Sequence, residues 1–236
     1  MATSSKIAVV IPALDEEQAI GRVIADIPDF VDEIMVVDNG SFDATAAVAR
    51  AAGARVVTEP ERGYGAACLA GIAALNAPDI IVFLDGDYSD DPARMAALVE
   101  PILSGKVDLV IGSRTLGRAE PGALAAHQRF GNWLACRLIR LIWGVRFTDL
   151  GPFRAIDTRA LEKLAMSERT FGWTVEMQIK SAALGLRLME IPVSYRPRIG
   201  RSKITGTIRG SFYAGSTILI LIARSAFLPE SKGQKS

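Results

Sequence analysis

Short apolar runs of strand length recur along the first half of this sequence, and stretches of helical length separate them. The runs are Ile7–Ile11, Ile34–Val37, Arg55–Thr58, Ile80–Leu84 and Leu109–Gly112. The fourth run is apolar throughout and does not alternate, which is typical of a strand covered by helices on both faces. The alternation therefore predicts an α/β fold with a mostly parallel sheet flanked by helices.

The second half of the chain has a different pattern. It predicts a helix from about Ala123 to Trp143, a helix over Trp173–Leu184, a strand at Leu188–Val193 and a last helix over Ser211–Leu228. The apolar stretch of the last helix is well short of the ~20 residues that span a bilayer, so we expect it either to pack on the core or to lie at a membrane interface. With 236 residues, we expect one catalytic domain over 1–205 and a helical, membrane-proximal segment with a polar tail over 206–236.

Composition narrows the possible function classes. The two cysteines lie far apart and there is one histidine, His127, so neither a zinc site nor a disulfide framework is indicated. The polar start does not fit a secretory signal peptide, which favours a reducing, cytosolic location. Residues 1–100 hold 17 Asp and Glu against 6 Lys and Arg, and residues 101–236 hold 9 against 21. The acidic half suits a divalent cation, and the basic half suits phosphate groups or an anionic membrane surface, although charges that only solvate helix faces would also explain the asymmetry.

The most informative motif is Asp85-Gly86-Asp87, which directly follows an apolar strand. Ligands of parallel sheets bind beyond the carboxyl ends of the strands, so both carboxylates are expected at a binding site. Two such groups can hold one cation, which can bridge the phosphates of a nucleotide diphosphate. The motif therefore predicts a metal-assisted nucleotide site.

Several further motifs, in this order, give the chain its resemblance to a known family. They are Val9-Val10-Ile11-Pro12-Ala13-Leu14-Asp15-Glu16-Glu17, Val36-Val37-Asp38-Asn39-Gly40-Ser41, Arg62-Gly63-Tyr64-Gly65, Asp85-Gly86-Asp87 and Gly112-Ser113-Arg114. Together they resemble the motifs of family 2 glycosyltransferases, which have the GT-A fold. Thr148-Asp149-Leu150-Gly151-Pro152-Phe153-Arg154 and Arg198-Ile199-Gly200-Arg201-Ser202-Lys203 are similar to the branch that makes dolichyl-phosphate mannose or glucose.

The resemblance implies roles for individual residues. The nucleotide sugar would be bound by Pro12, Leu14, Glu16, Asp38, Gly63 and Gly86. Mg²⁺ or Mn²⁺ would be bound by Asp85 and Asp87, with Ser89 as a candidate third ligand where the branch commonly has glutamine. Arg114 and Arg129 would grip the acceptor phosphate, and Arg198 with Lys203 would close over the donor diphosphate. An aspartate often stands where this chain has Asn39, a mild departure because an amide also accepts a hydrogen bond.

The acceptor decides the mechanism. A polyprenyl or dolichyl phosphate is already anionic, so it could attack the anomeric carbon without a protein base, and the reaction would invert its configuration. Asp87 and Arg114 would then be catalytic, and a hydroxyl acceptor would add Asp149 as base, although for Asp149 we favour capping or orienting the Gly151-Pro152 turn.

Other functions remain to be weighed. A dinucleotide-binding oxidoreductase would need G-x-G-x-x-G after the first strand, and a sugar-phosphate nucleotidyltransferase would need a glycine-rich basic loop there. The segment after Ile11 has neither. A non-catalytic nucleotide-binding scaffold of a membrane complex would be indicated by loss of Asp85 or Asp87, and both are present. We therefore expect a hexosyltransferase peripherally bound to the cytosolic membrane face, directly or through a membrane protein, with no nucleic-acid partner.

Overall fold

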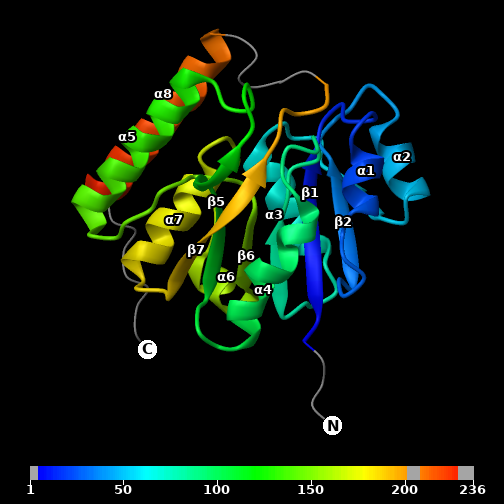
Figure 1. Ribbon diagram of the computed structural model, residues 1–236, viewed down its shortest axis with the longest axis horizontal. Helices are drawn as coiled ribbons and strands as arrows, with labels where there is room; N and C mark the ends of the chain where they lie inside the picture. The colour runs from blue at the N-terminus through cyan, green and yellow to red at the C-terminus, as the bar shows by residue number, and fades with distance from the viewer. Residues whose placement is uncertain (1–4, 201–207, 228–236) are drawn as a thin grey trace.

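A single sheet of seven strands organises residues 5–200 and 208–227, which the computed structural model describes (Figure 1). The strands are β1 (Ile7–Ala13), β2 (Glu33–Asp38), β3 (Arg55–Thr58), β4 (Ile80–Phe83), β5 (Leu109–Ala119), β6 (Arg154–Asp157) and β7 (Leu188–Tyr195). Their order across the sheet is β3-β2-β1-β4-β6-β5-β7. Strand β6 runs antiparallel to β4 and β5, while all other pairs are parallel. The predicted α/β fold with a mostly parallel sheet is therefore confirmed.

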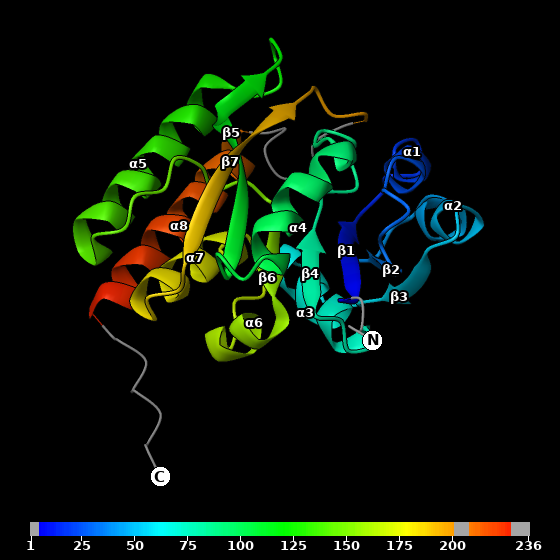
Figure 2. The ribbon, with the colours of Figure 1, turned by 60° about the horizontal axis from the view of Figure 1, so that its bottom comes forward.

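Helices cover both faces of this sheet (Figures 1 and 2). They are α1 (Ile20–Ala25), α2 (Thr45–Ala51), α3 (Tyr64–Ala74), α4 (Met95–Leu103), α5 (Ala126–Trp143), α6 (Thr158–Leu164), α7 (Trp173–Ala183) and α8 (Ile208–Phe227), and a 3₁₀ turn over Pro92–Arg94 leads into α4. Helices α1, α2 and α4 contribute to one apolar core. Helices α3 and α5 to α8 contribute to the other, in which α8 packs on α5 and α7.

The inner strands are apolar throughout because the side chains of each strand pack into both cores, one on either face of the sheet. In β4, Ile80 and Val82 belong to the core beneath α1, α2 and α4, whereas Ile81 and Phe83 belong to the opposite core. Successive side chains of a strand point to opposite faces, so a strand covered on both sides has no polar position.

Strand β6 and helix α6 were not expected from the sequence. Strand β6 has four residues, and charged side chains stand at both of its ends, Arg154 and Asp157. Such a short segment carries little periodic signal, and its place between β4 and β5 depends on pairing with residues more than forty positions away in sequence. The other expected strands and helices agree with the structure, apart from their ends.

The last helix packs on the protein through one side. Ile222 is 2% exposed in the core, whereas Leu219 and Ile220 are 40% and 64% exposed. This supports core packing for the inner side of the helix. No helix in the described ranges is both long enough and apolar enough to cross a membrane.

Candidate active site

The ends of β1, β2 and β4 meet at one edge of the sheet, where they border a cavity of about 380 Å³. The predicted donor-site residues among its lining are Pro12, Leu14, Glu16, Gly63, Asp85, Gly86, Asp87 and Arg198. The structure thus brings together residues up to 186 positions apart in the sequence. Asp38 is not in this lining, and its carboxylate instead accepts a hydrogen bond from Ser41 N at 3.0 Å.

Asp85 and Asp87 supply carboxylates to the cavity from the turn after β4. Asp85 Oδ1 is buried and accepts no hydrogen bond from any described residue. Burial, together with the negative charge of Asp87, raises the pKa of Asp85 to about 7. A buried, unpartnered oxygen beside a second carboxylate fits a divalent cation.

Ser89 contacts the second of these carboxylates. Its hydroxyl and backbone N–H both donate to Asp87 Oδ1, at 2.5 and 2.9 Å. In this arrangement Ser89 orients Asp87. Across residues 5–200 and 208–227, no three His, Cys, Asp or Glu side chains are grouped to hold a metal ion. A cation at Asp85 and Asp87 would therefore take further ligands from elsewhere, as Mg²⁺ commonly does from substrate phosphates and water.

Arg198 joins the loop after β7 to this acidic edge. Its guanidinium lies 2.5 Å from Glu16 Oε1 and 3.3 Å from Asp87 Oδ2. Its Nε is buried without a hydrogen-bond partner among the described residues, so it is free to donate to an anionic oxygen. The backbone reinforces the contact, because Ile199 N donates to Asp87 O at 3.0 Å. Lys203, predicted to act with Arg198, lies outside the described residues.

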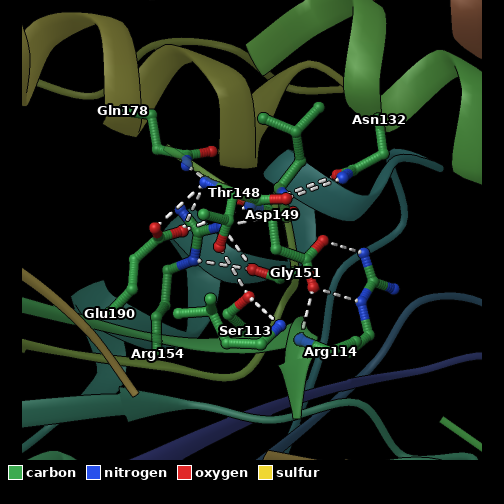
Figure 3. A network of polar contacts seen from close by, with 11 residues as sticks. Ser113, Arg114, Asn132, Thr148, Asp149, Gly151, Arg154, Gln178 and Glu190 are labelled. Atoms are coloured by element: carbon green, nitrogen blue, oxygen red, sulfur yellow. Dashed lines mark hydrogen bonds and ion pairs between the residues drawn. The ribbon is translucent and has the colours of Figure 1, made fainter. Parts of the chain in front are cut away.

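Arg114, midway along β5, and Asp149, which precedes β6, form a buried ion pair (Figure 3). Arg114 Nη2 and Nε donate to Asp149 Oδ1 and Oδ2 at 2.6 and 2.8 Å, and Arg114 N donates to Oδ2 at 2.7 Å. Burial by itself would lower the pKa of Arg114, but the Asp149 carboxylate outweighs it and raises that pKa. Asp149 is 1% exposed and uses both oxygens on Arg114, so it is placed to orient this cation. Arg129 is exposed on the first turns of α5.

The wall of the cavity depends on residues to which the sequence gave no specific role. Asn39 Nδ2 donates to the carbonyls of Glu59 and Glu61 at 2.9 and 2.7 Å, and its Oδ1 accepts from Gly63 N at 2.8 Å. The amide oxygen thus accepts a hydrogen bond, as we expected, and the amide nitrogen makes two further bonds that an aspartate could not make. Arg62, Thr170 and Phe171 also line the cavity and were missed.

The glycines of the Arg62–Gly65 motif allow the chain to approach itself closely. A Cβ at Gly63 or Gly65 would lie 2.1 Å from the carbonyl oxygen of Arg169 or Glu168, closer than any real contact. The N-terminus of α3 therefore packs directly on the segment that carries Thr170. The repeated glycine was the sequence signal for this contact, but it did not identify the partner segment.

Comparison with known proteins agrees with this geometry. Residues 8–165 match the family model described as Glycosyl transferase family 2. The chain belongs to this family. Over 88% of its length and 94% of the relative's, this glycosyltransferase is 37% identical to an uncharacterized glycosyltransferase of Mycobacterium tuberculosis.

Two relatives with more specific names match almost the whole chain. A dolichyl-phosphate hexose transferase of Haloferax volcanii is 32% identical over 93% of this glycosyltransferase and 96% of the relative. An undecaprenyl-phosphate mannosyltransferase of Micrococcus luteus is 29% identical over the same shares.

A solved structure extends the comparison. Glucosyl-3-phosphoglycerate synthase from Mycobacterium tuberculosis, in complex with Mn²⁺, UDP-glucose and phosphoglyceric acid, superposes with a TM-score of 0.78 at 27% identity. The match covers 97% of this glycosyltransferase and 82% of that chain. The GT-A fold expected from the sequence is thereby confirmed, and the family supports a nucleotide-sugar donor.

Proposed function

We propose that this enzyme transfers a hexose from a nucleotide diphosphate sugar to a polyprenyl phosphate, with Mg²⁺ or Mn²⁺ as cofactor. The observation that carries the proposal is the arrangement of two separate groups of charges at one sheet edge. Asp85, Asp87 and Arg198 border the cavity, while Arg114 of β5 is paired with Asp149. The first group suits a cation and a diphosphate, and the second presents a permanently charged guanidinium to a second anion.

In this proposal the donor lies in the cavity, and its diphosphate would separate Arg198 from Asp87, which are in contact at 3.3 Å without it. Arg198 Nε, which has no partner in the described chain, would donate to a phosphate oxygen. A divalent cation held by Asp85 and Asp87 would neutralise negative charge on the leaving nucleotide. Gly86 lines the cavity between these two carboxylates, so no side chain from this position enters the space proposed for the donor.

The acceptor phosphate would be held by Arg114, whose position Asp149 fixes. A phosphate oxygen that is already anionic attacks the anomeric carbon directly, the bond to the nucleotide diphosphate breaks, and the configuration inverts. No proton has to be removed in this step. The protein contributes alignment and fixed positive charge, which are the usual sources of catalysis in such displacements.

A hydroxyl acceptor is the second candidate, and the likeness to glucosyl-3-phosphoglycerate synthase, solved with phosphoglyceric acid, favours it. A hydroxyl needs a base, and we suggested Asp149 for that role. Both oxygens of Asp149 accept hydrogen bonds from Arg114, so proton abstraction would require this pair to open. We therefore favour the phosphate acceptor.

Helix α5 offers a surface that suits a membrane. Phe130, Trp133 and Leu141 are 62%, 55% and 72% exposed, and their spacing places them on one side of the helix. The exposed Arg137 stands on the same side, between Trp133 and Leu141. Aromatic and basic residues on one helix face are typical of peripheral binding to anionic lipid surfaces. We propose that this face of α5, in addition to the last helix, contacts the membrane that carries the acceptor.

Transfer assays test the main proposal. Labelled GDP- and UDP-sugars are incubated with a short polyprenyl phosphate and Mn²⁺ or Mg²⁺, with a chelator as control. We expect a lipid-linked sugar from one donor only, and no product with the chelator. Transfer to hydroxyl acceptors alone would exclude the phosphate acceptor, and undiminished transfer in the chelator would exclude the metal.

Flotation with anionic vesicles tests the membrane surface. The double variant Phe130→Ser/Trp133→Ser should lose vesicle binding. Phe42→Ser is a matched control, because Phe42 is 90% exposed just before α2, at the opposite end of the molecule from α5 (Figures 1 and 2). Equal binding by both variants and the wild type would exclude the α5 face.

A further inference from the structure

The backbone of residues 148–151 is held by side chains from four elements (Figure 3). Glu190 of β7 accepts from Thr148 N at 2.9 Å and from Asp149 N at 3.2 Å. Gln178 of α7 donates to Asp149 O at 2.9 Å. Arg154 of β6 donates to the carbonyls of Leu150 and Gly151. Residues 148–151 are therefore fixed from the sheet and from the core beneath it.

Asn132 of α5 makes the remaining attachment. Its Nδ2 donates to Thr148 O at 3.0 Å, and its Oδ1 accepts from Leu150 N at 2.8 Å. One side chain thus binds the backbone on both sides of Asp149. Because Asp149 in turn holds Arg114 through both carboxylate oxygens, the position of α5 is passed to that guanidinium through two consecutive sets of hydrogen bonds.

The place of Asn132 on α5 gives this contact its importance. In the helix, Phe130 stands two residues before Asn132 and Trp133 directly follows it. The centroids of these two rings are 5.8 Å apart, and both side chains are largely exposed. Among the four side chains described above that bind the backbone of residues 148–151, Asn132 alone comes from α5, the helix with this exposed aromatic face. The other three come from β6, β7 and α7.

We propose that Asn132 is a positioning residue for the acceptor: it holds Asp149, and through it Arg114, in register with the exposed face of α5. This inference rests on the proposed function, in which Arg114 binds the acceptor phosphate and α5 faces the lipid. The charged phosphate of a polyprenyl phosphate lies at the polar surface of the membrane, because only its lipid chain is apolar. The Arg114 guanidinium, held through Asp149 by the helix that contacts this surface, would lie at the level of that phosphate.

The test compares Asn132→Ala with Ile139→Val. Ile139 lies two turns further along α5, is 0% exposed and packs in the core, so its truncation weakens the helix without removing a bond to residues 148–151. We expect Asn132→Ala to lower kcat/KM for polyprenyl phosphate about ten-fold or more, and to leave the dissociation constant of the nucleotide sugar within about two-fold. Ile139→Val should change neither constant by more than about two-fold.

A second comparison separates positioning from general destabilisation. In an Arg114→Lys background, which already lacks the bidentate contact with Asp149, Asn132→Ala should lower kcat/KM further by no more than about two-fold. The inference is wrong if the two losses multiply, if donor affinity falls in parallel, or if Asn132→Ala and Ile139→Val have the same kinetics.

Hydrogen exchange keeps this test independent of the acceptor. The amide of Leu150 should exchange about ten-fold faster or more in Asn132→Ala but not in Ile139→Val, because only the first variant removes its acceptor. Wild-type protein that forms no lipid-linked product would overturn the proposed function. The exchange rates would then still decide whether Asn132 holds residues 148–151, and equal rates in the two variants would refute it.

Discussion

Replacing Asp85 with asparagine should stabilise the metal-free protein at alkaline pH while it removes a proposed metal ligand. Burial and the charge of Asp87 raise the pKa of Asp85 to about 7, from an ordinary 3.8. The folded chain therefore keeps a proton that the unfolded chain has already released, and the free energy of unfolding falls as the pH rises from about 4 to about 7. Asparagine has the shape of the protonated acid and carries no charge at any pH.

The size of the effect follows from this pKa. The pKa of Asp85 differs by about three units between the unfolded and the folded chain. At about 1.4 kcal/mol per unit, the ionised carboxylate lowers the free energy of unfolding by about 4 kcal/mol at pH 8. Because the Asp85 residue is only partly buried, solvent screens some of this cost, and we expect Asp85→Asn to gain about 2 kcal/mol. At about pH 5 the gain should be less than half as large, since the wild-type carboxyl is then mostly protonated.

Urea denaturation of both proteins at about pH 5 and pH 8, in chelator, measures this difference. Adding Mn²⁺ should then stabilise the wild type and have little effect on the variant. The reasoning fails if Asp85→Asn is no more stable than the wild type at pH 8, or if its gain is the same at both pH values.

Three other substitutions test the site, and Gly131→Ala is the control for the first of them. Gly65→Ala should lower the free energy of unfolding by about 1–3 kcal/mol, because its Cβ would lie 2.1 Å from the Glu168 carbonyl oxygen. Gly131→Ala in α5, where a Cβ would meet nothing within 4 Å, should raise it by about 0.5–1 kcal/mol. Urea denaturation measures both changes, and a change of the same sign in the two variants would contradict the close packing at Gly65. Asn39→Asp should lower the free energy of unfolding by about 1–3 kcal/mol and weaken nucleotide binding, since the carbonyls of Glu59 and Glu61 lose their donor. Calorimetry measures the nucleotide affinity, and an unchanged affinity would show that residues 59–63 keep their position without these two bonds. Arg114→Lys should lower lipid transfer by roughly 100-fold with donor affinity preserved, as the bidentate contact is lost, and a parallel loss of donor affinity would place Arg114 in the donor site.

The sequence by itself was sufficient for six of the seven strands and for one side of the site. Continuous apolar runs such as Ile80–Leu84 indicate strands between two cores, because backbone geometry alternates side chains between faces. The carboxyl ends of parallel strands gather at one edge, so Asp85 and Asp87 could be placed at a ligand site before their neighbours were known. These features depend on local sequence patterns, which most strands carry and the four-residue β6 does not.

Tertiary structure alone decided which side chains meet. Arg114 and Asp149 are 35 residues apart, and nothing in either motif indicates that they pair with each other. The same holds for Asn132, which sits in an amphipathic helix but bonds to the backbone around Asp149. Hydrogen bonds of this kind depend on how distant segments pack, and packing is set by the whole core. Thus the carboxylates of the proposed donor site are visible in the sequence, while the orientation of Arg114 follows only from the folded chain.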